Sequence, residues 1–348
     1  MDVLINHINA DRDLDQQHVD VAVAFLLDES ANVGKKVAFL EGLAAKGETA
    51  EEIAFFVSAL LAHAVDPGVA EMTLDGPTID VCGTGGDKLN LFNVSTTSMF
   101  VIAAGGAVVT KHGNRGITSK SGGADVLEAL GIRIDLPPEG FRHCLGQAGV
   151  GFLFAPQYHP AFKAVVPVRK VLAERGKRSI FNLIGPLLNP ASPQCQLVGV
   201  MENTLVPTFA EILQRLGRES VWAVNGSTAN GRAVDEVSLL GPTRICKAGS
   251  MQDAVDEEIH PGDFDLPVAE LADLQGGDAA QNAMILTAIL DGSDTGPKRD
   301  MILLNAAAGL ACAGLADTIS EGIEQARALI ESGKAYDRLV ALQKASNA

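Results

Sequence analysis

The spacing of apolar residues divides the chain into a helical beginning and a larger part in which strands and helices alternate. Over residues 1–66, apolar residues recur every three or four positions, which predicts helices packed on one another. From Pro77 onward, short apolar runs alternate with longer amphipathic ones, the pattern of a parallel sheet covered by helices. We therefore expect an α/β fold: a small all-helical N-terminal domain plus a larger α/β domain with a mostly parallel central sheet.

The same pattern locates the elements of the larger part. Residues 251–278 are acidic and lack a regular pattern, so we expect them to be irregular. Apolar runs predict strands at residues 79–82, 107–110, 132–135, 151–155, 196–200, 221–225 and 237–240. Helical spacing predicts helices at 95–104, 124–130, 138–148, 160–175, 205–216, 279–290 and 299–315, and a last one from 320.

Two consecutive strand–loop–helix units, residues 79–104 and 107–130, have loops rich in glycine and hydroxyl side chains. The first strand runs into Gly83-Thr84-Gly85-Gly86-Asp87, and Asn93-Val94-Ser95-Thr96 then begins a helix. Glycines let backbone N–H groups approach a ligand closely, and a helix N-terminus favours an anion. The second strand leads into Lys111-His112-Gly113-Asn114-Arg115. The two units therefore predict two phosphate-type sites on one edge of a parallel sheet.

The distribution of charge supports an anion site in these loops. The chain holds 27 Lys and Arg against 43 Asp and Glu, yet residues 88–124 contain no acidic residue and four basic ones. A buried core segment rich in glycine and alanine would also exclude acids, but it would not retain Lys and Arg among the glycines. The stretch is therefore predicted to hold a polyanion.

The overall composition argues against some classes of partner. A net charge of −16 disfavours nucleic acid or an anionic membrane as the main partner. Residues 88–201 nevertheless carry twelve basic and five acidic side chains, a balance that suits a small anionic substrate entering a local pocket. The five cysteines contain no CxxC pair, and we find neither a signal peptide nor an apolar run of membrane length. We therefore expect a cytoplasmic protein.

A series of short segments follows in a recognisable order along nearly the whole chain. They are GTGGD at 83–87, NVST at 93–96, KHGNR at 111–115, SGGADVLEALG at 121–131, FAPQYHP at 154–160, FNLIGPLLNP at 181–190, DEVS at 235–238 and NAA at 305–307. This ordered set resembles the anthranilate phosphoribosyltransferase family of tryptophan biosynthesis. The resemblance implies transfer of phosphoribose from phosphoribosyl pyrophosphate (PRPP) to the amine of anthranilate, with release of pyrophosphate.

The resemblance also implies an organisation, a cofactor and a set of contacts. A helical domain of residues 1–75 would be joined by residues 160–190 after a second crossing, and 76–159 with 191–348 would form the PRPP-binding α/β domain. The expected cofactor is Mg²⁺, two ions per subunit, and the expected assembly is a homodimer through the helical domain. The implied PRPP contacts are Gly83, Gly86, Asp87, Asn93, Val94, Ser95, Thr96, Lys111, His112, Gly113, Asn114, Arg115, Thr118, Ser119 and Gly123.

The acidic pair Asp235-Glu236 is the candidate metal site. An acidic doublet alone is usually a solvated turn, but this one stands in the family's register, just before a predicted strand. Carboxylate oxygens are ligands that Mg²⁺ prefers, and Mg²⁺ would offset the charge of the leaving pyrophosphate. Ser95 is a third metal ligand by resemblance.

The resemblance to the family also implies the residues that contact anthranilate, which are Gly83, Asn114 and Arg169. The guanidinium of Arg169 suits a carboxylate, because the two can form parallel charge-assisted bonds. For His159, packing at the hinge and contact with the acceptor both stay open. His112 is expected to shape its loop instead of acting as a general base, since an aromatic amine is already nucleophilic.

Four features depart from the family pattern, so other functions stay possible alternatives. Leu91 stands where a threonine is common, Gly123 replaces a serine, and the segments after Arg169 and at 225–235 are longer. The alternatives are a phosphoribosyltransferase with another aromatic acceptor, or a pyrimidine nucleoside phosphorylase. Complete GTGGD, NVST and DE motifs favour PRPP with metal over inorganic phosphate. A non-catalytic nucleic-acid-binding relative would be expected to lose these motifs and gain positive charge.

Overall fold

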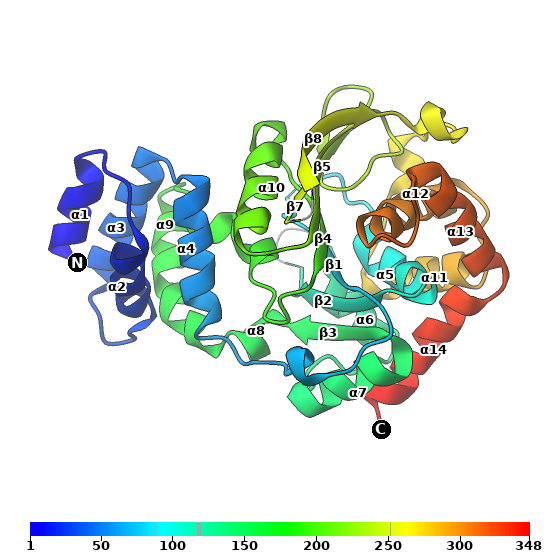
Figure 1. The fold of residues 1–348 in the computed structure, drawn as a ribbon, viewed down its shortest axis with the longest axis horizontal. Helices are drawn as coiled ribbons and strands as arrows, with labels where there is room; N and C mark the ends of the chain where they lie inside the picture. Colours follow the sequence, from blue (N-terminus) through cyan, green and yellow to red (C-terminus); the bar gives the residue numbers. More distant parts are fainter. Residues whose placement is uncertain (87, 117–119, 251) are drawn as a thin grey trace.

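A computed structural model describes residues 1–86, 88–116, 120–250 and 252–348 of the chain. A helical domain stands beside a larger α/β domain, which confirms the expected fold class (Figure 1). The N-terminal helices are α1 (Asp2–Asn9), α2 (Gln16–Leu27), α3 (Val33–Lys46) and α4 (Ala50–Leu61).

Residues 160–174 return to the helical domain. The expected single helix is a 3₁₀ segment, η2 (Pro160–Val165), followed by α9 (Val166–Glu174), which has a proline in its first turn. The segment η2 packs on α2, and α9 packs on α3. The ammonium of Lys36 is buried at this junction and donates to the carbonyls of Leu26 (2.8 Å) and Ala164 (3.4 Å). These contacts agree with a second crossing, while the domain boundaries given above stay predictions.

The central sheet has the strand order β3-β2-β1-β4-β5-β7-β8, and β6 pairs with β5. Neighbours from β3 to β5 are parallel, whereas β6, β7 and β8 pair antiparallel. The strands are β1 (Thr78–Gly83), β2 (Val108–Gly113), β3 (Val150–Phe154), β4 (Cys195–Gly199), β5 (Ser220–Ser227), β6 (Ala233–Val234), β7 (Thr243–Gly249) and β8 (Gln252–Ile259).

Helices cover both faces of the sheet, and side chains that alternate along each strand enter different cores. In β1, Ile79 and Val81 join the core under α5, α11, α12, α13 and α14, whereas Cys82 joins the core shared with α10 and the helical domain (Figure 1). The helices of this domain are α5 (Val94–Ala104), α6 (Gly123–Ala129), α7 (Pro138–Ala148), α8 (Ala155–Tyr158), α10 (Val206–Arg215), α11 (Ala279–Leu290), α12 (Pro297–Cys312), α13 (Ile319–Glu331) and α14 (Lys334–Ser346).

The predictions for residues 132–135 and 237–240 were wrong, because neither segment is a strand. Residues 132–136 do alternate, with Ile132, Ile134 and Leu136 buried, but the N–H of Arg133 donates to the Ser346 hydroxyl at 3.2 Å. Alternation there reflects packing of an extended segment that does not join the sheet. Residues 237–240 are buried in a series of bends next to the site described below.

Two further predictions needed correction. Part of the supposedly irregular region 251–278 is the edge strand β8, and β7 before it was not predicted. The terminal helix is divided into α13 and α14 at Gly333, whose φ of 77° lies in the left-handed region that glycine tolerates.

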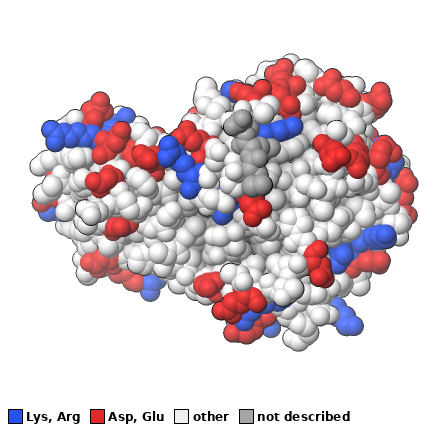
Figure 2. Space-filling model, in the orientation of Figure 1, with Lys and Arg blue, Asp and Glu red and all other residues white. Residues whose placement is uncertain are grey.

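The cysteines and the charged residues lie where the composition predicts, the cysteines in the core and many charged side chains on the surface. All five cysteines are buried and free of disulfides. On the face shown in Figure 2, acidic side chains lie over both domains, with basic ones in small groups among them. Within the described part of the chain, no helix combines the length and the apolar character needed to span a membrane.

Candidate active site

The loop after β1 is shaped by glycines at the edge of the sheet. Gly85 and Gly86 have φ of 72° and 94°, in the left-handed region that glycine adopts without strain. The N–H of Thr84 donates to the Gly199 carbonyl at 2.9 Å, and the Thr84 hydroxyl accepts from the N–H of Met201 at 3.0 Å. The expected Gly-rich turn therefore crosses to the end of the neighbouring strand β4.

The N-terminus of α5 lies next to this loop. Asn93 precedes the helix, and its side chain donates to the Ser121 carbonyl (3.2 Å) and accepts from the Asn282 amide (2.7 Å). Asn93 thus braces the loop between two other segments. The N–H of Ser95, in the first turn of α5, donates to the carboxylate of Glu236 at 3.3 Å. Because helix N–H groups carry partial positive charge, this position suits an anionic group.

Asp235 and Glu236 cross the ends of three neighbouring strands, and each of those strands has a glycine beneath them. A Cβ atom on Gly83 would lie 2.5 Å from Asp235 Oδ2, and one on Gly199 would lie 1.6 Å from the Asp235 carbonyl. A Cβ on Gly226 would lie 2.5 Å from the Glu236 carbonyl. At Gly199 and Gly226 the atoms in the way are backbone carbonyls, so only glycine there leaves room for the acidic pair, whereas at Gly83 the nearest atom belongs to the Asp235 side chain.

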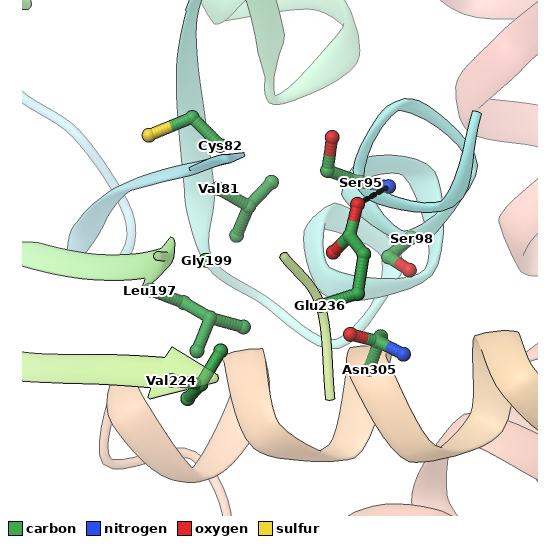
Figure 3. A pocket seen from close by; sticks show the side chains of 9 residues that line it. All are labelled: Val81, Cys82, Ser95, Ser98, Leu197, Gly199, Val224, Glu236 and Asn305. Carbon is green, nitrogen blue, oxygen red and sulfur yellow. Dashed lines mark hydrogen bonds between the residues drawn. The ribbon is translucent and has the colours of Figure 1, made fainter. Parts of the chain in front are cut away.

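The two carboxylates belong to different parts of the site. Asp235 Oδ2 accepts from the N–H of Gly85 at 2.6 Å, which ties it to the Gly-rich loop. Glu236 extends toward Ser95 and Ser98 of α5, with Asn305 of α12 on its other side (Figure 3). These residues line a cavity of about 10 Å³, room for roughly one water molecule. Among the described residues, the buried hydroxyl of Ser98 has no hydrogen-bond partner.

Lys111 is buried beneath the same site. Its ammonium donates to the Val81 carbonyl at 2.5 Å and to the Ser95 hydroxyl at 3.2 Å. A buried carboxylate, Asp80, lies nearby, and burial raises its pKa although Lys111 opposes that shift. Lys111 thus orients Ser95, one of the expected metal ligands, and its contact with a phosphate stays a prediction.

The loop after β2 closes on itself through Asp125. One oxygen of this carboxylate accepts from the N–H groups of Gly116 (2.9 Å) and Gly122 (2.8 Å). Arg115 is exposed and pairs with Asp125 and Glu128, acids that follow the acid-free stretch. The positive charge expected here is therefore partly neutralised by acidic side chains of α6.

Other expected PRPP contacts occupy the same loops. Asn114 is exposed, and its side-chain oxygen accepts from the N–H of Arg115 at 2.8 Å. A Cβ on Gly123 would lie 2.9 Å from the Thr96 hydroxyl, so the glycine found here lets Thr96 and the start of α6 lie close together. Gly113 ends β2, and Val94 begins α5. Asp87, Thr118 and Ser119 lie outside the described residues.

His112 and His159 form a buried pair behind this loop. The ring centroids are 5.2 Å apart in an edge-to-face arrangement, and His159 Nε2 donates to the Leu188 carbonyl at 2.9 Å. Burial, followed by the charges of His159 and Lys111, lowers the pKa of His112 to about 3. Burial also lowers the pKa of His159. Both rings are therefore neutral near pH 7, while packing at the hinge and contact with the acceptor both stay predictions for His159.

We expect this pair to make the protein sensitive to acid. Unfolded His112 binds a proton below about pH 6.5, but the folded ring resists protonation down to about pH 3. The free energy of unfolding should therefore fall as pH drops through that window, by up to about 1.4 kcal/mol per unit. Urea unfolding of wild type and His112→Phe between pH 7 and 4.5 would measure this, with a flatter curve expected for the variant. Identical curves would contradict it.

Arg169 lies at a different cavity. It is exposed on α9 and borders a space of about 340 Å³. In the longer segment that follows, Arg175 pairs with Glu41 and Arg178 pairs with Glu202. The residues lining this cavity are Val166, Arg169, Lys170, Leu172, Ala173, Lys177, Ser179 and Asn182, none of which lines the cavity at Glu236. The structure thus brings Asp235, Glu236, Ser95, Lys111 and the Gly-rich loop together, but not Arg169.

Sequence reasoning missed three residues that build the site: Gly199, Gly226 and Asn305. Gly199 lies within a predicted strand, at residues 196–200, and Gly226 follows another, and a glycine there can signal close approach of another backbone. Asn305 stood in the recognised NAA segment without an assigned role. Asn305 lies on α12, and its partner Val237 is 68 residues away in the sequence, so a local pattern could not reveal the contact.

Gly-rich loops and a helix N-terminus at the carboxyl ends of parallel strands commonly bind phosphate groups, and a family comparison identifies a class of transferases. Residues 75–336 match the model described as "Glycosyl transferase family, a/b domain". A curated relative, anthranilate phosphoribosyltransferase of Herpetosiphon aurantiacus, is 41% identical over 337 residues, 96% of each chain. That of Chloroflexus aggregans is 42% identical and covers 95% of this chain and 94% of its own.

Solved structures give the same result. Anthranilate phosphoribosyltransferase from Thermus thermophilus has a TM-score of 0.87 and 34% identity, and 99% of each chain is covered. The Saccharomyces cerevisiae enzyme in complex with PRPP and Mg has a TM-score of 0.81 and 29% identity, and the match covers 95% of this chain and 92% of that one. The chain belongs to the anthranilate phosphoribosyltransferase family.

Proposed function

We propose that the chain transfers the phosphoribosyl group of PRPP to the amine of anthranilate. The bond from ribose C1 to pyrophosphate breaks, a bond from C1 to the amine nitrogen forms, and the amine loses a proton. The observation that carries this proposal is the Asp235-Glu236 pair, held against the Gly-rich loop and the N-terminus of α5. Family membership supports the same reaction.

The donor set suits Mg²⁺. Asp235, Glu236 and the Ser95 hydroxyl offer only oxygen ligands, and glycines beneath the pair leave space for it. Among the described residues, no group of three or more His, Cys, Asp or Glu side chains is placed so that it could hold a metal ion. Mg²⁺ is typically bound by one or two carboxylates together with substrate phosphates. When bound, it would neutralise charge on the departing pyrophosphate. Two ions per subunit is part of the proposal.

The chain's own residues would bind and orient PRPP. N–H groups of Gly86 and Thr96 suit pyrophosphate oxygens, because they belong to a glycine turn and a helix start. The N–H of Val94, also expected to bind PRPP, donates to the Phe92 carbonyl at 2.8 Å and would have to leave that bond. Asn93 would hold the loop, since its side chain already bridges Ser121 and Asn282. Lys111 would keep the Ser95 hydroxyl oriented. Holding donor and acceptor in line removes much of the entropic cost of the reaction.

The reaction is tested by supplying the purified protein with PRPP, Mg²⁺ and a panel of amines that includes anthranilate. We expect a phosphoribosylated anthranilate and stoichiometric pyrophosphate. Uridine or thymidine with inorganic phosphate serves as the second arm, since a nucleoside phosphorylase would cleave them. Product only in that arm, or only with an amine lacking a carboxylate, would overturn the proposal.

The acceptor carboxylate is expected to depend on Arg169; this expectation rests on the family resemblance, because Arg169 borders a cavity separate from the one at Glu236. We expect Arg169→Ala to raise KM for anthranilate roughly ten- to hundredfold and to change KM for PRPP little, since a charge-assisted bond contributes about 1.5–3 kcal/mol. Steady-state kinetics with each substrate varied would measure the two constants. Arg175→Ala is the matched control, because that arginine pairs with Glu41. Equal weakening of both substrates would assign Arg169 a structural role.

A homodimer through the helical domain is proposed as well. Val3 on α1 is 77% exposed and Val21 on α2 is 56% exposed, which leaves apolar surface on that domain. Light scattering of the purified protein would give its mass. A mass near 36.3 kDa, that of one chain, would contradict the dimer.

A further inference from the structure

One side chain from a distant helix holds the backbone next to Glu236. Asn305 lies in α12 and is 2% exposed. Its Oδ1 accepts from the N–H of Val237 at 3.0 Å, and its Nδ2 donates to the Val237 carbonyl at 2.8 Å. A third bond, from Nδ2 to the Met301 carbonyl at 2.9 Å, orients the amide within its own helix. Both backbone polar groups of the residue after Glu236 are therefore paired with Asn305.

The two hydrogen bonds between Asn305 and the Val237 backbone replace the strand pairing that residues 235–240 lack. The strand β6 ends at Val234, and the acidic pair and residues 237–240 form bends instead of a ladder. Further along, the N–H of Ser238 donates to the Thr243 hydroxyl at 2.9 Å. Buried backbone groups without partners are costly, so side chains must supply what a neighbouring strand would. Asn305 does so at the position adjacent to the metal-binding candidate.

Helix α12, which carries Asn305, also positions the helix α5 whose first turn contacts Glu236. Helix α12 packs against α5, whose first turn donates the Ser95 N–H to Glu236. Asn305, Ser95 and Glu236 line one cavity (Figure 3). The position of the Glu236 carboxylate relative to the α5 N-terminus is thus set by two helices packed on each other.

We propose that Asn305 is a positioning residue for the metal-binding carboxylates, an inference that rests on the proposed function. It acts through the Val237 backbone, to which both polar groups of its amide are bonded. An asparagine suits this task because its amide offers a donor and an acceptor side by side. Alanine supplies neither group, and leucine fills the volume without supplying them.

The experiment compares Asn305→Ala and Asn305→Leu with Leu304→Ala, which removes a fully buried side chain from the same helix. Mn²⁺ binding in the presence of PRPP is measured by electron paramagnetic resonance, and melting temperatures report stability. The Mg²⁺ concentration for half-maximal rate is measured in parallel. We expect both Asn305 variants to weaken Mn²⁺ binding roughly tenfold or more, since residues that orient metal ligands typically matter on that scale. Excess Mg²⁺ should restore part of the rate.

The control separates positioning from general destabilisation. Leu304→Ala should lower the melting temperature and leave the Mn²⁺ titration unchanged. Asn305 variants whose metal titration matches wild type, or shifts no more than that of Leu304→Ala at equal loss of stability, would overturn the inference. The leucine variant keeps the core filled should the alanine variant fold poorly. Absence of Mn²⁺ binding in wild type would instead overturn the metal site on which the proposed function relies.

Discussion

Replacing Asp235 or Glu236 by alanine should lower kcat/KM by roughly a hundredfold or more. A loss of that size corresponds to about 3 kcal/mol of transition-state stabilisation, which is reasonable when a metal no longer offsets the pyrophosphate charge. Both side chains are only partly buried, so the fold should survive. The measurement is the initial rate with PRPP and anthranilate over a range of Mg²⁺ concentrations.

The matched control for this prediction is Glu258→Ala. Glu258 is also acidic, and its side chain is 64% exposed on β8, so its removal changes net charge equally. We expect the control to keep wild-type rates. Full activity of both site variants in excess chelator would refute the metal assignment.

Adding a single methyl group at Gly199 should lower activity almost as much as replacing Asp235 or Glu236 by alanine. A Cβ there would lie 1.6 Å from the Asp235 carbonyl oxygen, a backbone atom that no side-chain rotation can move. The acidic pair must shift, or β4 must separate from β1, with which Gly199 is in register at Gly83. We expect Gly199→Ala to lower activity roughly a hundredfold, and to destabilise the fold by about 1–3 kcal/mol, the usual cost of overpacking. Rate and urea unfolding would measure the two effects.

Gly146→Ala provides the comparison. Gly146 is exposed within α7, and a Cβ there would meet no atom within 4 Å. Alanine at this position should leave activity unchanged and stabilise the helix slightly, by about 0.4–1 kcal/mol. A Gly199→Ala enzyme with wild-type rate and stability would show that the acidic pair is not held against β4 as described.

The two Gly-rich loops that follow β1 and β2 were accessible to sequence reasoning because their signals are local. A short apolar run, a glycine turn and a helix start follow one another within residues 79–104, and the structure has β1, the loop and α5 in that order. The acidic pair was found by its place in a recognised order of motifs. Its exposure, its contacts and the glycines beneath it were not predicted.

What the sequence alone determined is the fold class, the family and the segments that contribute to the site, since these follow from hydrophobic periodicity and short ordered motifs. The contacts among these segments were decided by the tertiary structure, because the sequence of a buried segment does not show which other segment packs against it. Residues 237–240 were predicted as a strand from their apolar character, yet their neighbour Glu236 is positioned by Asn305, whose contact with Val237 spans 68 residues. The bonds of the Lys111 ammonium to the Val81 carbonyl and the Ser95 hydroxyl were not predicted either, and its contact with a phosphate stays a prediction. Such hydrogen bonds join segments that are distant in sequence, so they depend on how the sheet and its helices pack together.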